Sequence, residues 1–235
     1  MSAPRLELRA VSKSYADGEQ NVEVLHHVSL SAGAGTVTAL LGRSGCGKTT
    51  LLNLAGAMDF PTSGEVLIDG RPTASLSEPE LTALRRTRVG FVFQFFQLLP
   101  TLSVLENVEL PLLLAGASHT SAAALDHLQW VGLADKSAAF PYQLSGGQMQ
   151  RVAIARALVS SPDILIADEP TGNLDTASGD QVLSLLREAA TRFGATILMA
   201  THSAEAAAIA DVRVHLRDGR IQSIDQSIGS SPNQR

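Results

Sequence analysis

A stretch of nine residues, GRSGCGKTT, has the residue types and the spacing that bind a nucleotide phosphate. Its glycines let successive backbone N–H groups turn toward phosphate oxygens, because no Cβ atom obstructs them. Lys48 would bring a positive charge to the β- and γ-phosphates, and the hydroxyl of Thr49 would bind Mg²⁺. The residues predicted to hold the nucleotide are Gly42, Arg43, Ser44, Gly45, Cys46, Gly47, Lys48, Thr49 and Thr50. They fit the P-loop pattern, although a glycine-rich turn can also arise by chance.

Two adjacent acids, Asp168 and Glu169, end the apolar segment ILIADE. Acids at the end of a strand are usually only solvated, but a phosphate-binding loop in the same chain gives them a use. Asp168 is predicted to hold Mg²⁺ through water, and Glu169 to orient and deprotonate the attacking water. Loss of Asp168 should then weaken binding of the Mg-nucleotide, whereas loss of Glu169 should spare binding and abolish turnover.

Three further residues stand at strand ends. Gln94 ends VGFVFQ and His202 ends ILMATH, and each alone is more often a hydrogen-bonded residue at a strand edge. The carboxyl ends of parallel strands converge on the ligand crevice, where Gln94 could bind the metal or the attacking water. His202 could there donate to a γ-phosphate oxygen. Tyr15, at the end of the first strand, could stack on a purine or could simply pack at an edge.

A second anion-binding device follows about a hundred residues later. LSGGQMQ, residues 144–150, places a serine and two glycines before an amphipathic run. A capping serine and free N–H groups make such a helix N-terminus a site for an anion. One chain thus carries two phosphate-binding elements, which serve either two sites or the two halves of one.

Strands and helices alternate around these motifs. Strands are expected at 6–15, 36–41, 64–70, 89–94, 163–169 and 195–201, with a hairpin at 212–225, and helices at 48–58, 77–86, 176–193 and from 203. Residues 103–160 have helical spacing without a convincing strand, and the polar tail 227–235 is expected to fray. The alternation predicts an α/β fold with a largely parallel sheet. We predict a single domain, 1–235, with an α/β core at 1–94 and 159–235 and a helical subdomain at 95–158.

Composition limits the classes of function. The chain has 235 residues, is 45% apolar and carries a net charge of -5, so no nucleic-acid partner is expected. Its one cysteine excludes an intrachain disulfide, and its longest apolar run, LPLLLAGA, is too short to cross a bilayer. No signal peptide is evident at the N-terminus. We therefore expect a chain that is soluble alone and reaches a membrane only through a partner.

The motifs GRSGCGKTT, Gln94, LSGGQMQR, LIADEPTGNLD and THS occur in the order and spacing typical of nucleotide-binding subunits of ABC transporters. The chain resembles that family from residue 6 to about 225, and the signature LSGGQ paired with a P-loop is very specific. The resemblance implies a P-loop NTPase core, with a mostly parallel sheet and an antiparallel β part, carrying an inserted α-helical subdomain. It implies an ATPase that uses ATP and Mg²⁺. The implied site residues are Tyr15 (A-loop), Gln94 (Q-loop), Ser145, Gly146, Gly147 and Gln148 (signature), Asp168 and Glu169 (Walker B), Asp175 (D-loop) and His202 (switch histidine), with Thr49, Gln94 and Asp168 at the metal.

The resemblance also implies partners. Members of the family form head-to-tail dimers in which Lys48 of one copy and the signature of the other would grip one ATP. A permease-type membrane subunit is expected to dock near Gln94–Pro100, where FFQLLP follows the Q-loop, and to hold the chain at the cytoplasmic side of the inner membrane. An exposed apolar patch there would support this docking, whereas burial of both phenylalanines and both leucines would weaken it.

A finer resemblance is to the subgroup that contains LolD, MacB and FtsE, carried by GFVFQFFQLLPTLSVLENVELPLL and DEPTGNLD. It favours export, lipoprotein release or mechanotransmission. The alternatives are an FtsE-like role in cell division and a soluble ABC ATPase acting on DNA or ribosomes. The chain departs from the subgroup at Gln148-Met149-Gln150 and at Cys46, where a small residue such as serine is common. A thiol beside Lys48 and a helix N-terminus suggests that alkylation of Cys46 blocks nucleotide binding.

Overall fold

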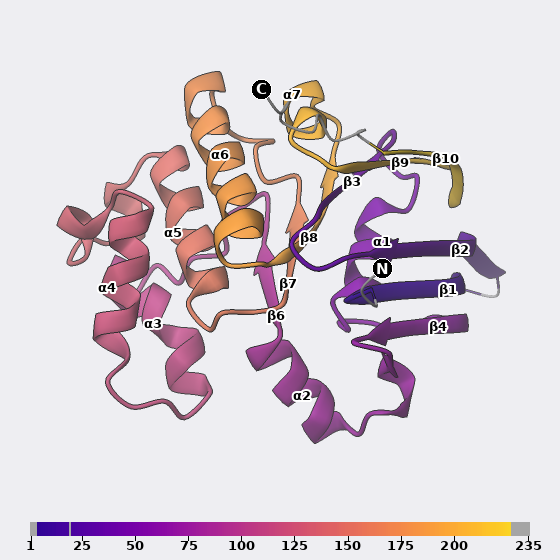
Figure 1. Ribbon diagram of the computed structural model, residues 1–235, viewed down its shortest axis with the longest axis horizontal. Helices are drawn as coiled ribbons and strands as arrows, with labels where there is room; N and C mark the ends of the chain where they lie inside the picture. Colours follow the sequence, from indigo (N-terminus) through magenta and orange to yellow (C-terminus); the bar gives the residue numbers. More distant parts are fainter. Residues whose placement is uncertain (1–3, 19, 227–235) are drawn as a thin grey trace, which may run out of the picture.

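A six-stranded sheet forms the centre of the computed structural model, which describes residues 4–18 and 20–226 (Figure 1). Its strands are β3 (Val37–Leu41), β6 (Val89–Val92), β7 (Ile164–Asp168), β8 (Thr196–Thr201), β9 (Val212–Arg217) and β10 (Arg220–Gln226). They lie in the order β10-β9-β3-β8-β7-β6, and every neighbouring pair except β10–β9 is parallel. The carboxyl ends of the parallel strands therefore share one edge. The predicted tail 227–235 lies outside the described residues.

A second, antiparallel sheet lies beside the first. It consists of β2 (Gln20–Ala32), β1 (Leu6–Asp17), β4 (Ser63–Ile68) and β5 (Arg71–Pro72), in that spatial order. The sequence pattern predicted neither β2 nor the two-residue strand β5. Ala10 and His27, at φ 46° and 49°, lie where the β1–β2 register shifts, so Leu25 and Val28 are both buried although they differ by an odd number of positions.

Helices cover both faces of the parallel sheet (Figure 1). α1 (Lys48–Ala55) packs on one face, and α5 (Gly146–Leu158) and α6 (Thr176–Arg192) pack on the other. Side chains along a strand alternate between the faces: Leu40 belongs to the core under α1, and Ala39 belongs to the core under α5 and α6. Two short helices, α2 (Glu78–Thr87) and α7 (Ala204–Ala208), complete this part of the molecule.

A helical region lies between β6 and β7. It contains α3 (Val104–Leu114), α4 (Thr120–Trp130), the 3₁₀ turns η2 (Ala134–Lys136) and η3 (Pro141–Gln143), and α5, and no strand is described within it. Glutamate and serine side chains form capping boxes at the starts of α2 and α3. Because α5 packs on the helices and on the sheet, the proposed division at residues 94/95 and 158/159 stays a prediction.

These observations confirm the predicted fold class: an α/β core with a parallel sheet, an antiparallel part and a helical insert. Among the described helices, none has both the length and the apolarity that a bilayer crossing requires.

Candidate functional site

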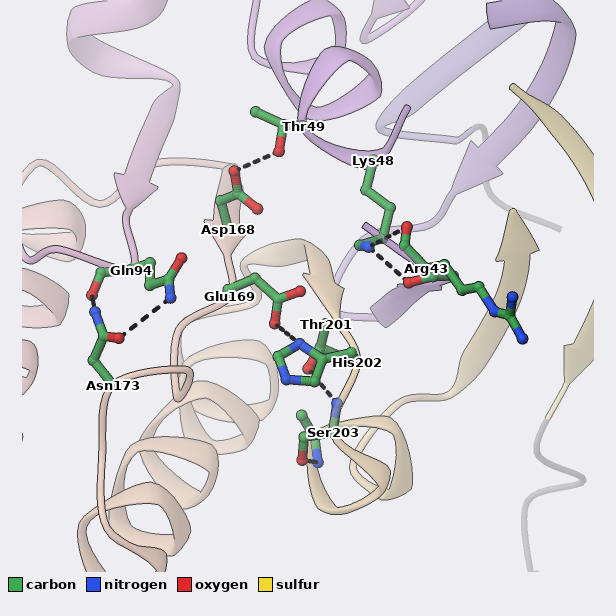
Figure 2. Close-up of polar contacts among 12 residues, drawn as sticks. Arg43, Lys48, Thr49, Gln94, Asp168, Glu169, Asn173, Thr201, His202 and Ser203 are labelled. Carbon is green, nitrogen blue, oxygen red and sulfur yellow. Dashed lines mark hydrogen bonds and ion pairs between the residues drawn. The ribbon is translucent and has the colours of Figure 1, made fainter. Parts of the chain in front are cut away.

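The P-loop connects the end of β3 to the start of α1. Gly47 has a φ of 102°, and a Cβ atom on it would lie 2.8 Å from a methyl carbon of Leu25. A Cβ atom on Gly42 would lie 2.3 Å from the carbonyl oxygen of Leu216. The Lys48 ammonium donates to the carbonyl oxygens of Gly42, at 2.7 Å, and Arg43, at 3.2 Å (Figure 2). The loop therefore requires glycine at these two positions. Two of its carbonyl oxygens hold the Lys48 ammonium close to the loop.

A cleft of about 730 Å³ opens above this loop, at the carboxyl ends of the parallel strands. Residues from β2, the P-loop, α1 and the ends of β6, β7 and β8 line it. They are Val24, Gly42, Arg43, Ser44, Gly45, Gly47, Lys48, Thr49, Thr50, Gln94, Asp168, Glu169 and His202. Residues predicted from four separate motifs thus share one cleft.

Asp168 and Thr49 face each other across the cleft. The Thr49 hydroxyl donates to Oδ2 of Asp168 at 2.9 Å (Figure 2). Burial raises the pKa of Asp168 above its usual value, and the charge of Glu169 acts in the same direction. The hydrogen bond from Thr49 and the charge of Lys48 oppose this shift. A cation bound beside the Thr49 hydroxyl would offset this penalty, because it would stabilise the ionised form of Asp168.

Glu169 lies directly after β7 and is held by His202. Nδ1 of His202 lies 2.9 Å from Oε2 of Glu169, so the proton of this bond is on Nδ1 when the carboxylate is ionised (Figure 2). The Glu169 side chain is 17% exposed, against 72% for His202. The Glu169 backbone has a φ of 45°, and its N–H donates to Ala200 at 3.0 Å. This uncommon conformation turns the carboxylate into the cleft instead of along the strand.

Gln94 enters the cleft from a loop. β6 ends at Val92, so Gln94 lies two residues beyond the strand that was predicted to end on it. Its Nε2 donates to Oδ1 of Asn173 at 3.3 Å, and Nδ2 of Asn173 donates to the Gln94 carbonyl at 3.1 Å (Figure 2). These two hydrogen bonds fix the side-chain amide of Gln94. Its Oε1 is therefore the atom left to bind a ligand.

The signature residues do not line the P-loop cleft. Ser145 caps α5, accepting from the Gln148 N–H at 3.3 Å, while the Gln148 side chain accepts from the Ser145 N–H at 2.9 Å. Beside them, Asp175 caps α6 and accepts from the N–H and the hydroxyl of Ser178, both at 2.9 Å. These bonds hold the pKa of Asp175 below its usual value. α5 packs on the sheet face opposite α1, so the two phosphate-binding elements of one chain are separated by the sheet.

Two other predicted residues also lie outside the cleft lining. Tyr15 is 39% exposed, its hydroxyl donates to Asp59 at 2.9 Å, and the Lys13 ammonium lies 4.8 Å from its ring centroid. Burial, followed by the bond to Asp59, raises the pKa of Tyr15. Cys46 is 6% exposed and belongs to the core under α1, so the protein largely shields it from a thiol reagent.

Sequence reasoning missed two contributors. Val24 lines the cleft from β2, a strand that was not predicted. Gln150 on α5 was quoted only as part of a motif, yet its amide contacts the loops of both Gln94 and Glu169.

Known proteins resemble this chain in sequence and in fold. The sequence matches the family described as ABC transporter over residues 25–172. It is 44% identical over 223 residues to the lipoprotein-releasing system ATP-binding protein LolD of Bordetella pertussis, covering 94% of this chain and 96% of LolD. It is 47% identical over 221 residues to the macrolide export ATP-binding/permease protein MacB of Rhodopseudomonas palustris, covering 93% of this chain but 34% of MacB.

A solved structure has the same architecture. The ATP-binding cassette MJ0796, in a dimeric post-hydrolysis state bound to ADP and Pi, superposes with a TM-score of 0.88 at 40% identity. The match covers 95% of this chain and 99% of that one. The chain therefore belongs to the ABC transporter family. Within it, the chain is an ATP-binding subunit that hydrolyses ATP to ADP and phosphate, and its relatives include LolD and MacB.

Proposed function

We propose that two copies of the chain form a head-to-tail dimer with ATP at their interface, and that the dimer drives a membrane partner. The observation that carries the dimer is that α1, which begins at the P-loop, and α5, which begins at the signature, pack on opposite faces of one sheet. A single chain therefore cannot bring both its P-loop and its signature to the same phosphate. A two-fold axis pairs the P-loop of each copy with the signature of the other, and the dimeric form of MJ0796 supports this arrangement.

In each site the P-loop amides and Lys48 bind the β- and γ-phosphates. The partner's Gly146 and Gly147 add the N–H groups of a second helix N-terminus, and its Ser145 adds a hydroxyl. Gln148, which closes the capping box, keeps those groups aimed outward. Tyr15 offers one ring face to the purine, because Lys13 already covers the other by a cation–π contact. Asp175 holds the start of α6 beside the signature.

Oxygen donors of Thr49, Asp168 and Gln94 suit Mg²⁺, which prefers one or two carboxylates together with substrate phosphates. No described group of three or more acidic, histidine or cysteine side chains could form a metal cage alone, as expected for an ion held largely by the nucleotide. When bound, Mg²⁺ neutralises charge on the β- and γ-phosphates.

Glu169 takes a proton from the attacking water in this proposal. His202 keeps the carboxylate aimed into the cleft, and when both ring nitrogens carry protons its Nε2 can donate to a γ-phosphate oxygen. Glu169→Gln should therefore lower steady-state phosphate release by 100-fold or more, while a fluorescent ATP analogue still binds within about threefold of wild type.

Glu205→Gln is the matched control, since Glu205 lies near His202 but outside the P-loop cleft. It should retain wild-type turnover. Undiminished phosphate release by Glu169→Gln would remove Glu169 from the mechanism.

A groove of about 470 Å³ between α2, β6 and α3 fits a membrane partner. Met58, Leu110 and Leu114 give it an apolar wall, and three arginines, Arg85, Arg86 and Arg156, line it without a carboxylate among the lining residues. None of the three has an ion pair with any described residue. This chemistry suits a cytosolic helix with an apolar face and an acidic residue.

The predicted patch after Gln94 supports docking on this side of the molecule. Phe95 is 69% exposed and Leu99 is 43% exposed, whereas Phe96 and Leu98 are half-buried. Arg156 connects the patch to the groove, because its guanidinium donates to the Phe96 carbonyl at 2.9 Å.

A photo-crosslinking amino acid at Leu114 tests the docking. In cells it should link the chain to an integral membrane protein, and that link should weaken when Arg86 is changed to glutamate. Leu125 on α4 is also exposed but does not line the groove, so it serves as the control position. Equal crosslinking from both positions, or links to soluble proteins alone, would contradict the proposed groove.

We propose that the chain works on a membrane partner at the cytoplasmic side of the membrane, and the named roles of its relatives support this. LolD is named for lipoprotein release and MacB for macrolide export, and we propose work of this kind for the chain. No observation specifically favours the cell-division alternative.

A further inference from the structure

A single side chain on the signature helix joins the two loops that carry Gln94 and Glu169. Gln150 is 0% exposed. Its Nε2 donates to the carbonyl oxygen of Pro170 at 2.7 Å and to that of Phe93 at 3.3 Å. Phe93 directly precedes Gln94, and Pro170 directly follows Glu169. Both protons of one amide group therefore fix the backbone beside the two functional residues.

The orientation of this amide is determined by its surroundings. Two carbonyl oxygens face it, so only the NH₂ end can point toward them. Its Oε1 is buried and has no hydrogen-bond partner among the described residues. A buried acceptor without a hydrogen-bond partner costs free energy. An apolar side chain of similar size at this position would avoid that cost. The pair of donated bonds is therefore the specific property that glutamine supplies here.

Both loops need such support. The residues after Gln94 include Phe96 and Gln97 at φ 57° and 51°, and Glu169 itself is at φ 45°. Non-glycine residues in this region are strained and persist only where neighbours hold them. Gln150 lies within the helix that begins at the signature serine, so it connects the signature to both loops of the same chain.

We propose that Gln150 is a positioning residue for ATP hydrolysis: it sets Gln94 and Glu169 relative to each other and to the signature helix. When the signature of a chain docks on its partner's ATP, Gln150 carries the position of α5 to that chain's own catalytic loops. This inference rests on the proposed roles of Gln94 and Glu169. It adds a residue that contacts neither the nucleotide nor the metal in the proposed site.

The test replaces Gln150 with leucine, which keeps the size but donates no hydrogen bond. We expect kcat for ATP to fall at least tenfold, toward the hundredfold loss that a misplaced catalytic group causes. The KM for ATP should stay within about twofold, and Gln150→Leu combined with Glu169→Gln should still dimerise with ATP. A purely structural role would instead lower nucleotide affinity and dimerisation together with kcat.

Arg151→Met is the matched control on the same helix. Arg151 also donates from a side chain to a backbone carbonyl, at 2.9 Å, but that carbonyl belongs to Val131 in the helical region. The control should lower the melting temperature without the fall in kcat. An equal fall in kcat for both variants would show that loss of any buried bond on α5 is enough, and would overturn the proposal.

Gln150→Glu provides a second readout if the leucine variant does not fold. Its protonated carboxyl can donate one of the two bonds, whereas its charged form repels both carbonyl oxygens. The ratio of its kcat to wild-type kcat should rise as the pH falls from 8.5 to 6. A ratio that does not change with pH would overturn the proposal.

Glu169→Gln, assayed in parallel, separates the two levels of inference. If it loses turnover while Gln150→Leu keeps wild-type kcat, the positioning role alone is wrong. If Glu169→Gln keeps turnover, the proposed site and the positioning role both fail.

Discussion

Asp168 shows how one residue can serve function at a cost to stability. Its pKa is raised by burial and by the charge of Glu169, so the folded protein disfavours the charged form that a cation needs. The folded pKa lies above the unfolded one. Its effect on stability is therefore neutral below the unfolded pKa, where the group is protonated in both states, and becomes a full destabilisation once the pH has risen through the folded pKa.

Removing this charge should stabilise the protein in the absence of nucleotide. The amide oxygen of an asparagine at this position could still accept the Thr49 hydrogen bond, so Asp168→Asn should raise the melting temperature at pH 7 by about 2 °C. The gain should vanish as the pH falls toward 4, and Mg-dependent ATP binding should weaken. Calorimetric scans at several pH values, with and without MgATP, measure both effects. A variant that is less stable than wild type at pH 7 would contradict the explanation.

At the scale of elements, the close approach of α5 to β6 places the signature helix. A Cβ atom on Gly90 would lie 2.3 Å from the carbonyl oxygen of Ala157, so only glycine allows this contact. Gln150 and Arg156 then reach from α5 to the loops beyond β6. The position of the helix and the position of the loops are thus set together.

Gly90→Ala should push α5 away from the strand and lower the free energy of unfolding by about 1–3 kcal/mol, as overpacking does. Gly33→Ala is the control, because a Cβ atom there would meet only a methyl group of Thr36 at 3.7 Å. Urea denaturation of both variants measures the difference. Equal stability of the two variants would show that the α5–β6 contact adjusts without strain.

The sequence predicted the elements whose periodicity is undisturbed. β3, β7 and β8 are buried apolar runs, and α2 has a clear capping signal, so their positions follow from local pattern. β2 escaped prediction because the conformations at Ala10 and His27 shift its register against β1. Val24, which lines the cleft from β2, escaped prediction together with that strand.

The site was predictable only in part, because some of its contacts depend on tertiary packing and not on local pattern. The P-loop, Asp168 and Glu169 follow from local motifs and a strand end. Gln150 donates hydrogen bonds to Phe93, 57 positions before it, and to Pro170, 20 positions after it. These bonds depend on tertiary packing, and no spacing in the sequence reveals them. Alkylation of Cys46 was expected to block nucleotide binding because the thiol lies beside Lys48 and a helix N-terminus, but the structure buries Cys46 in the core under α1.

At the scale of the whole molecule, the parallel sheet separates α1, which follows the P-loop, from α5, which follows the signature. The proposed ATP site is therefore complete only when a second copy supplies its signature. In the proposed dimer, ATP contacts both copies and so stabilises their association, and hydrolysis removes the shared γ-phosphate. The arginine-lined groove beside α3 would carry the resulting movement to the membrane partner.

The oligomeric state of Glu169→Gln tests this central claim most directly. Because the variant keeps ATP bound, light scattering during size-exclusion chromatography at micromolar protein concentration should give a dimer in saturating MgATP and a monomer without nucleotide. Adding Ser145→Arg should abolish the dimer while MgATP still binds, since the signature half of the site is then blocked. A Glu169→Gln protein that stays monomeric in saturating MgATP would contradict the account.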